Sequence, residues 1–558
     1  EEGKRPRDVE IRDEQTRKQV DVYQAYEEQC QREGVVDFAE LMLRTYELLR
    51  DNDPLREHYQ RRFHHVLVDE FQDTNRLQYA WLKMFAPPGS DQGVFAVGDD
   101  DQSIYAFRGA RVGNMADFER EYAVQRVVKL EQNYRSYGHI LDAANDLISH
   151  NTHRLGKNLR TDAGAGEPVR VFEATSDFAE AQWFLDEAQQ LHRSGTPRQE
   201  IALLYRSNAQ SRVIESALFN AGVPYRVYGG LRFFERAEVK HALAYLRLLE
   251  NPNDDTSFLR VVNFPARGIG ARSIEQLQDA ARASGRSLAQ SVGAVAGKAG
   301  LNLQAFVRLL DEARTRTQGL TLREIIEHIL HASGLLDFYK TEKEGQDRIE
   351  NLEELVNAAE SFVTQEGFGK DAVALPVDEQ GQAAPPVPDA ETGEIMSPLA
   401  AFLTHASLEA GDNQAQAGQD AIQLMTVHSA KGLEFDAVFI TGIEEGLFPH
   451  ENSLSDADGL EEERRLMYVA ITRARQRLYL SFSQTRMLHG QTRYNVKSRF
   501  FDELPEGSLK WLTPKNQGFG SGYAREYQQA WQRGSGLSGI VGAGRVEPMA
   551  RPPAPAPM

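Results

Sequence analysis

The chain has 558 residues, 41% of them hydrophobic, which is enough for several domains with buried cores. Its net charge of −19 argues against a protein that coats nucleic acid through charge alone. A single cysteine, Cys30, excludes an internal disulfide framework and favours a reducing cytosol. We find no signal peptide and no apolar run of about 18 residues, and we therefore expect a cytoplasmic protein. Because the chain begins with Glu1 in a charged stretch, we expect its true N-terminus to be missing.

Residues 1–62 are polar and predicted to be helical, and the first strand signal follows at Val66–Val68. This short apolar run is typical of a buried central strand. Asp69 and Glu70 come directly after it, at the end where open α/β sheets build their ligand sites. Asp69 is then placed to hold Mg²⁺, and Glu70 to orient or deprotonate an attacking water. An acidic strand-to-loop turn without a ligand is the alternative, because short motifs often match by chance.

A second strand signal at Val94–Val97 follows a helical pattern at Leu77–Phe85, and this alternation predicts a parallel, doubly wound sheet. The second strand leads into Gly98–Gly109, where a glycine and three acids precede Gln102. An amide beside the predicted metal site is suited to contact a terminal phosphate or the attacking water. A solvent-exposed loop rich in aspartate is the alternative.

Leu130–Ser136 is predicted to open a helix, and two of its side chains suit a nucleotide. Tyr134 offers a flat face for a base, and Arg135 offers a planar fork for a phosphate. A second α/β pattern continues to a strand at Ile201–Tyr205.

From about Gly229 the pattern changes to consecutive helices. Among them, Gly268 and Gly270 form a Gly-x-Gly turn whose backbone N–H groups can face a phosphate. A plain helix–helix connection is the alternative. Residues 365–398 lose periodicity and gather proline, so we expect a flexible surface loop there. The α/β pattern then returns in 424–440, followed by a helix at 461–472.

Residues 464–500 contain nine basic residues and no acidic one, and aromatic residues lie among them. One interpretation is a solvated helix face. The other is a surface that follows phosphates and stacks bases. The aromatic residues concerned are Tyr468, Tyr479, Phe482 and Tyr494.

Five segments together resemble, in order, the helicase motifs of the UvrD/PcrA/Rep family of superfamily 1 DNA helicases. The resemblance extends from about residue 20 to about residue 510. It implies two RecA-like P-loop motor domains with ATP bound between them, each interrupted by a helical insertion. The segments are Asp69–Asp73, Gly98–Tyr105, Asn133–Ser136, His428–Phe435 and Val469–Ala474.

The resemblance implies a division of the chain into domains. Residues 1–62 are the remainder of a helical insertion, and 63–130 are the remainder of the first RecA-like domain. The second RecA-like domain comprises 131–228 and 420–514, with a helical insertion at 229–419. Residues 515–558, rich in glycine, proline and glutamine, are expected to form a disordered tail.

Roles at the nucleotide follow from the resemblance, with ATP and Mg²⁺ as cofactors. Asp69 and Glu70 take the Mg²⁺ and water-activating roles, and Gln102 senses the terminal phosphate. The other implied contacts are Tyr134 to adenine, Arg135 and Arg473 to the γ-phosphate, Glu434 to the ribose, and Gly432 beside it.

Roles at DNA follow in the same way. Tyr105, Phe107, Arg108 and His450 fall where the family contacts single-stranded DNA, and Gly268 and Gly270 would hold the duplex. Phe107 stands where the family usually has tryptophan. His489, at the tip of a predicted hairpin, replaces the aromatic pin thought to split the duplex. Both substitutions keep a ring for stacking but weaken it.

A nucleotide motor needs the loop Gly-x-x-x-x-Gly-Lys-Ser/Thr, whose N–H groups and lysine hold the phosphates. The four Gly-Lys pairs of this chain precede Arg5, Asn158, Ala299 and Asp371, so none of them fits. We expect the loop to lie upstream, in a part of the protein that this chain lacks, and the chain alone to be inactive.

The leading hypothesis is an ATP- and Mg²⁺-dependent 3′-to-5′ DNA helicase of repair and replication, located in the bacterial cytosol with the nucleoid. Its partners would be single-stranded DNA, single-strand/double-strand junctions, and repair or replication proteins, with no membrane. The rival is a non-catalytic fragment that binds single-stranded DNA. A helicase–nuclease fusion is weaker, because the C-terminal tail has no carboxylate cluster.

Overall fold

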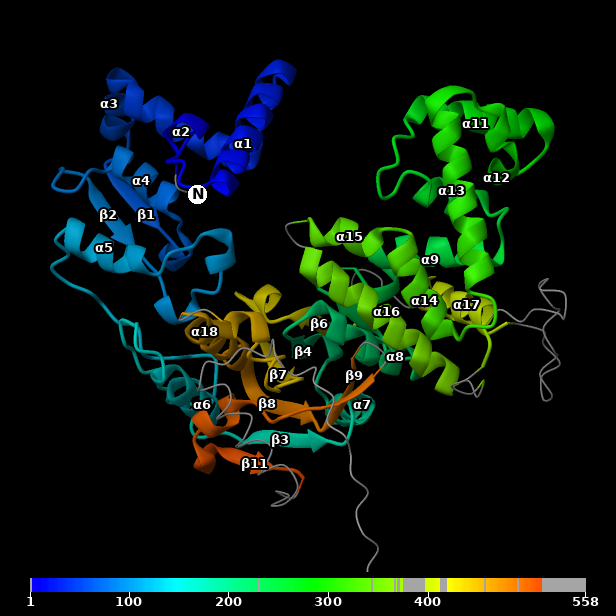
Figure 1. Ribbon diagram of the computed structural model, residues 1–558. Helices are drawn as coiled ribbons and strands as arrows, with labels where there is room; N and C mark the ends of the chain where they lie inside the picture. The colour runs from blue at the N-terminus through cyan, green and yellow to red at the C-terminus, as the bar shows by residue number, and fades with distance from the viewer. Residues whose placement is uncertain are drawn as a thin grey trace, which may run out of the picture. The chain divides into compact units, whose positions relative to one another are not determined.

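The computed structural model describes residues 3–228, 231–342, 345–365, 368, 372–374, 397–411, 419–455, 458–488 and 491–513. Within these residues the predicted α/β class is confirmed: a two-stranded and a seven-stranded parallel sheet are combined with many helices (Figure 1). None of the described helices is both long enough and apolar enough to cross a bilayer. The predicted flexible loop at 365–398 lies mostly, and the predicted tail at 515–558 entirely, outside the described residues.

The N-terminal part consists of helices around a two-stranded sheet (blue in Figure 1). Four of its helices begin at an Asp or Asn whose side chain accepts a backbone N–H of the first turn, as N-caps do. The elements are α1 (Glu14–Glu33), α2 (Phe38–Asp51), α3 (Asp53–Arg62), β1 (His65–Val68), α4 (Arg76–Phe85), β2 (Gly93–Ala96) and α5 (Gly113–Glu121).

The prediction that Val66–Val68 is a buried central strand is wrong. Within the described part of the chain, β1 pairs only with β2, in parallel, and Leu67 and Phe95 are 75% and 64% exposed. Val66 and Val68 pack with Phe71, so one face of the pair has a core. A continuous apolar run is typical of a strand covered on both faces, but the described residues cover only one face of β1.

The seven-stranded sheet draws its strands from two separate stretches of the chain. Its order is β11-β3-β8-β7-β4-β6-β5, and every neighbouring pair is parallel. The predicted strand at Ile201–Tyr205 is β4, and all five of its residues are buried. The other strands are β3 (Val169–Ala174), β5 (Tyr225–Val227), β6 (Ile422–Thr426), β7 (Phe435–Ile440), β8 (Ala474–Ser483) and β11 (Leu509–Trp511).

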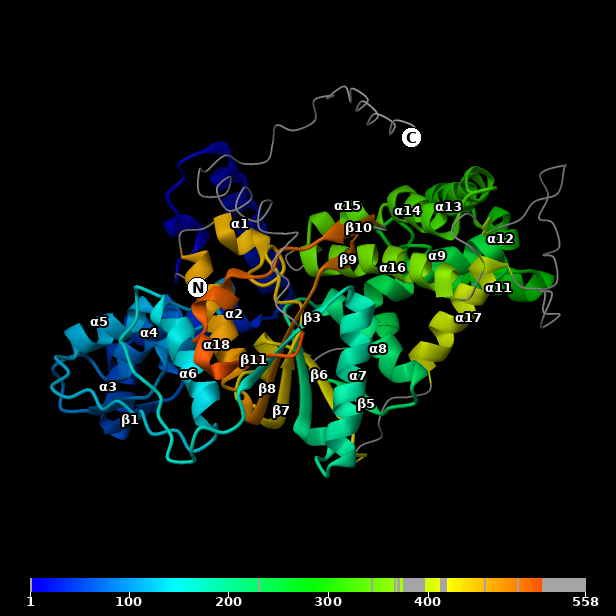
Figure 2. The same cartoon turned by 90° about the horizontal axis from the view of Figure 1, so that it is seen from below.

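Helices cover both faces of this sheet, as the alternation of side chains along a strand requires. Ala202 and Leu204 of β4 pack on one side with α6 (Gly138–Ser149) and α18 (Gly459–Ile471). Leu203 points to the other side, where α7 (Asp177–Arg193) and α8 (Ser211–Asn220) complete a second core. Figure 2 shows α7 and α8 together beside the strands. The carboxyl ends of the strands are therefore left for the loops that carry the predicted motifs.

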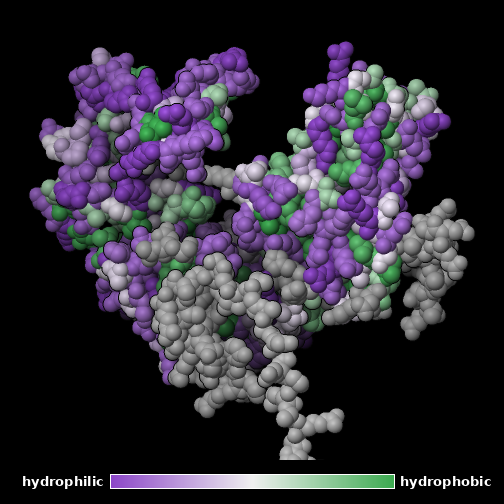
Figure 3. All heavy atoms as spheres, in the orientation of Figure 1, coloured by the Kyte–Doolittle hydropathy of each residue, from purple (hydrophilic) through white to green (hydrophobic). Residues whose placement is uncertain are grey.

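Between β5 and β6 the described chain is helical, as predicted, and these helices share one large apolar core (green to yellow in Figure 1). Hydrophilic residues cover most of the face drawn in Figure 3, in keeping with 26% charged residues. The helices are α9 (Ala237–Glu250), α10 (Asp255–Val261), α11 (Ala271–Ser284), α12 (Leu288–Ser291), α13 (Gly297–Arg316), α14 (Leu322–Ala332), α15 (Leu335–Lys340), α16 (Gly345–Gln365) and α17 (Pro398–Gly411).

The predicted hairpin is present as β9 (Thr485–Leu488) and β10 (Gln491–Tyr494), which pair in antiparallel fashion. His489, predicted at its tip, lies outside the described residues. Its role as a pin therefore stays a prediction.

Candidate nucleotide and DNA-binding site

The Asp69–Glu70 turn lies against the loop that follows β2. Glu70 adopts a left-handed backbone with φ of 49°, and its N–H donates to Asp69 Oδ1 at 2.9 Å. Gln72 donates to Glu70 Oε2 at 2.6 Å and accepts the Asp99 N–H at 2.9 Å. A Cβ at Gly98 would lie 2.7 Å from Gln72 Oε1 and 3.3 Å from the backbone nitrogens of Phe71 and Gln72, so the two loops approach closely there. The two strand ends thus meet, as their parallel pairing predicts.

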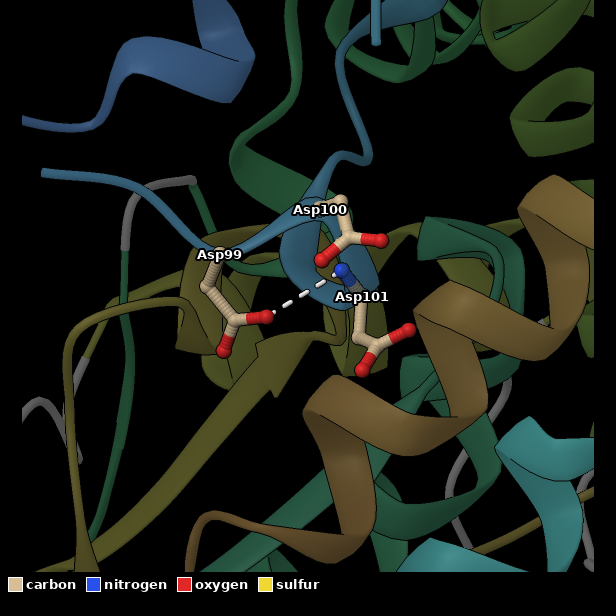
Figure 4. A group of neighbouring side chains, drawn as sticks. All are labelled: Asp99, Asp100 and Asp101. Carbon is tan, nitrogen blue, oxygen red and sulfur yellow. Dashed lines mark hydrogen bonds between the residues drawn. The ribbon is translucent and has the colours of Figure 1, made fainter. Parts of the chain in front are cut away.

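The three acids after Gly98 are neither a solvent-exposed loop nor an open metal site. One carboxylate oxygen from each lies within 4.8 Å of those of the other two, and Asp99 accepts the Asp101 N–H at 3.1 Å (Figure 4). Arg154 binds Asp101 through two hydrogen bonds of 3.0 and 2.8 Å. Lys157 binds both Asp101, at 3.0 Å, and Asp99. Burial raises the pKa of Asp101, but these two cations lower it further than burial raises it.

Gln102 is tied to this cluster rather than directed into open space. Its side-chain amide donates to Asp99 Oδ2 at 2.6 Å. Any contact of Gln102 with a phosphate would therefore compete with Asp99. The sensing role of Gln102 stays a prediction.

Lys431 joins the loop after β6 to the Asp69–Glu70 turn, and it was not among the predicted site residues. Its ammonium donates to Asp73 Oδ2 at 2.6 Å and to the Gln102 carbonyl at 2.9 Å, and lies 3.4 Å from Glu70 Oε2. Burial raises the pKa of Asp73, although Lys431 opposes this effect. A signal existed in the sequence, since Lys431 lies inside the recognised segment His428–Phe435.

The structure brings Arg135 and Glu434 into contact, 299 positions apart. Arg135 Nε donates to Glu434 Oε2 at 2.5 Å, and its Nη1 donates to the Thr472 carbonyl at 3.3 Å. The Arg135 hydrogen bond lowers the pKa of Glu434. Tyr134, next to Arg135, is 92% exposed, which leaves its ring free to stack on a base. Gly432, two residues before Glu434, turns the chain with φ of 84°.

Arg473 lies beside this pair but is enclosed. It is 2% exposed and donates to the carbonyls of Val469 and Leu433 at 3.0 and 3.1 Å. Burial and the positive charge of Arg135 lower its pKa to about 10. Within the described residues it therefore supports the loop between β6 and β7 and the end of α18, and its phosphate contact stays a prediction.

The predicted DNA-contacting residues Tyr105, Phe107 and Arg108 gather in one cluster. The Arg108 guanidinium lies 5.1 Å from the Tyr105 ring centre and 5.4 Å from that of Phe107. Phe107 is 60% exposed and meets the His428 ring edge-on at 5.6 Å. Burial and, to a smaller extent, the positive charge of Arg206 lower the pKa of His428 to about 4, so the ring is neutral at pH 7. An exposed aromatic ring beside a guanidinium suits a stacked base.

His450 and the Gly-x-Gly turn are placed elsewhere. His450 Nε2 lies 3.8 Å from Glu350 Oε1 on α16, and its backbone N–H donates to Glu463 at 3.0 Å. Gly268 has φ of 70°, and Gly270 directly precedes α11. The turn thus connects α10 to α11, which fits both of the alternatives stated for it.

The interpretation of residues 464–500 as a phosphate-following surface is wrong for most of the run. Seven of its nine cations form ion pairs with carboxylates, Arg473 binds backbone carbonyls, and Arg493 is exposed. Tyr468, Tyr479 and Phe482 are buried, whereas Tyr494 is 87% exposed. In a chain with 82 acidic and 63 basic residues, cations meet internal carboxylates readily.

The matches to known protein families define a chain of the helicase class. Residues 1–123 match the UvrD/REP helicase N-terminal domain, and residues 128–485 match the UvrD-like helicase C-terminal domain. The chain belongs to the UvrD-like helicase family, as the resemblance predicted.

Individual relatives are similar over most of the chain. DNA helicase II of Escherichia coli is 48% identical over 493 residues, which are 87% of this chain and 65% of that protein. DNA helicase II of Haemophilus influenzae is 45% identical, with 91% of this chain and 67% of that protein covered. The ATP-dependent DNA helicase PcrA of Bacillus subtilis is 40% identical, with 89% and 65% covered. The chain thus spans about two thirds of the length of these relatives.

Proposed function

We propose that the full protein is an ATP-dependent DNA helicase and translocase that moves 3′ to 5′ and acts in repair and replication. The observation that carries this proposal is the Lys431 contact with Asp73 and Glu70. It sets the loop after β6 against the Asp69–Glu70 turn, so that one nucleotide can be held from both sides. The relatives named ATP-dependent DNA helicase support the proposal.

At the nucleotide, Glu70 would orient and deprotonate the attacking water, and Arg135 would reach the γ-phosphate. Tyr134 would stack on adenine, and Glu434 would accept hydrogen bonds from the ribose hydroxyls. Asp69 fits Mg²⁺, because its exposed carboxylate offers the oxygen donors that this ion prefers. When bound, Mg²⁺ neutralises charge on the phosphate oxygens.

The domain division belongs to the same proposal. Residues 131–228 and 420–514 would form the second motor domain, which is supported by one sheet built from both stretches. Residues 229–419 would form its helical insertion, and 1–62 and 63–130 would belong to the first motor domain and its insertion. The chain has no Gly-x-x-x-x-Gly-Lys-Ser/Thr loop, so the activity is proposed for the full protein.

The missing loop also favours a second candidate, a chain that binds single-stranded DNA without hydrolysis. Both candidates place DNA at Tyr105, Phe107 and Arg108, with His450, His489, Gly268 and Gly270 as further contacts to single strands and junctions. Only the first candidate requires Glu70 and Arg135 to matter for turnover. Repair or replication proteins are proposed partners.

Replacing Phe107 by alanine is expected to weaken binding of single-stranded DNA, because one stacked base contributes about 1–3 kcal/mol. Fluorescence anisotropy of a labelled oligothymidylate measures the dissociation constant. Phe178→Ala is the matched control, since Phe178 on α7 is 53% exposed and lies outside the cluster. Equal affinities of the Phe107 variant and the unaltered protein would show that single-stranded DNA does not stack on Phe107.

A further inference from the structure

Arg475 is surrounded by three carboxylates next to the proposed nucleotide site. Its Nε donates to Asp436 Oδ1 at 2.9 Å, and its Nη1 donates to Glu434 Oε1 at 3.4 Å. Its Nη2 pairs with Glu200, at the end of the short helix Arg198–Glu200. A guanidinium has five N–H donors in a rigid fork, so one arginine can hold several carboxylates at fixed positions.

Glu434 is shared by two arginines. Oε2 accepts from Arg135 at 2.5 Å, and Oε1 accepts from Arg475 at 3.4 Å. The two arginines differ in their other partners among the described residues: Arg135 Nη1 binds the Thr472 carbonyl at 3.3 Å, whereas Arg475 is also held by Asp436 and Glu200. Arg135 can therefore release Glu434 more easily than Arg475, which two further carboxylates hold in place.

In the proposed function, the γ-phosphate of bound ATP competes with Glu434 for the Arg135 guanidinium, so Arg135 would release Glu434 when ATP binds. Glu434 would then lose its shorter hydrogen bond at the moment when its carboxylate is needed by the ribose. An exposed glutamate without a fixed partner samples many rotamers, and ordering it costs free energy.

We propose that Arg475 is a positioning residue, which holds Glu434 toward the ribose of the bound nucleotide after Arg135 has turned to the phosphate. The inference rests on the proposed function. Arg475 is anchored to β7 through Asp436 and, through Glu200, to the short helix that directly precedes β4, so it stays in place when Arg135 moves. The ribose hydroxyls then meet a carboxylate that is already oriented.

The test measures specificity for the ribose, which would not change if Arg475 only stabilised the fold. Isothermal titration calorimetry of the full protein gives the affinities for ATP and for 2′,3′-dideoxy-ATP, and their ratio reports the ribose contact. Arg475→Met is expected to lower the ATP affinity about tenfold, on the scale of one hydrogen bond to a charged group, and to leave the dideoxy-ATP affinity unchanged. Arg475→Lys is expected to restore part of the ratio.

Arg477→Met is the matched control. Arg477 lies two residues further along β8, has 34% side-chain exposure against 31% for Arg475, and pairs with Glu167 instead of Glu434. Its ratio is expected to equal that of the unaltered protein. Glu200→Gln removes one of the ion pairs that hold Arg475 but leaves Glu434 unchanged, and it is expected to lower the ratio as Arg475→Met does. It tests the proposal even if the Arg475→Met variant does not fold.

Three outcomes separate this inference from the proposed function. If Glu434→Gln abolishes the preference for ATP but Arg475→Met and Glu200→Gln keep it, the role of Arg475 is overturned and the ribose site stands. If the unaltered protein does not distinguish the two nucleotides, the ribose role of Glu434 fails and the inference falls with it. If neither nucleotide binds, the proposed nucleotide site itself is wrong.

Discussion

Replacing Arg135 by alanine is expected to slow ATP hydrolysis by the full protein by about 10³–10⁵-fold, the effect of removing an arginine that stabilises the transferring phosphoryl group. Binding of single-stranded DNA is expected to persist, because the DNA-contacting cluster at Tyr105, Phe107 and Arg108 is built from other residues. Steady-state hydrolysis with saturating DNA and anisotropy of a labelled oligonucleotide measure the two effects separately.

The choice of Arg135 over Arg473 follows from their surroundings. The Arg135 side chain is 30% exposed and held by one carboxylate and one carbonyl, whereas Arg473 is enclosed by backbone carbonyls. Arg473→Ala is also expected to abolish hydrolysis and spare DNA binding, but with a loss of stability that Arg135→Ala does not show. Arg477→Ala serves as the control, because Arg477 lies on β8 and pairs with Glu167 instead of Glu434. Equal loss of hydrolysis and DNA binding in the Arg135 variant would contradict its assignment to the phosphate.

Replacing Lys157 by methionine is expected to lower the free energy of unfolding by about 3–5 kcal/mol, the cost of breaking a buried ion pair on one side. Lys157 binds Asp99 and Asp101, whose side chains are 22% and 2% exposed, and its ring contact with Tyr468 is 5.3 Å. Without the ammonium, Asp101 keeps Arg154 as a cationic partner, whereas Asp99 keeps only neutral N–H donors among the described residues. Chemical denaturation followed by circular dichroism measures the change.

Lys129→Met is the matched control for this prediction. Lys129 is exposed and donates to the carbonyls of Leu155 and Gly156, in the same loop as Lys157, but binds no carboxylate of the cluster. Its replacement is expected to change stability by less than about 0.5 kcal/mol, as for an ordinary surface residue. Unfolding of the Lys157 variant at the same denaturant concentration as the control would show that the cluster does not hold the two loops together.

Local patterns predicted much of the fold. Ile201–Tyr205 is β4 to the residue, and the consecutive helices predicted from about Gly229 are present from α9 onward. These signals arise within single elements, where side-chain periodicity reports burial directly. The exposed Leu67 is the exception, because whether a second layer covers a strand is not encoded in the strand itself.

The parts of the site that depend on ion pairs between residues far apart in the sequence were harder to predict. Glu70 and Arg135 stand in recognisable segments, but nothing near Arg475 or Lys157 in the sequence identifies Glu434 or Asp101 as a partner. The same limitation explains the basic run at 464–500, in which the charge of each residue was visible and its internal carboxylate was not. Ion pairing across many residues is a property of the folded chain.

The most direct test of the central claim is ATP hydrolysis by the full protein, with and without single-stranded DNA, beside a Glu70→Gln variant. The account predicts hydrolysis that DNA stimulates and that the variant loses, because the neutral amide cannot take a proton from the attacking water. The variant is expected to bind DNA as before. DNA-stimulated turnover that persists in Glu70→Gln, or DNA binding without any turnover in the unaltered protein, would contradict the claim.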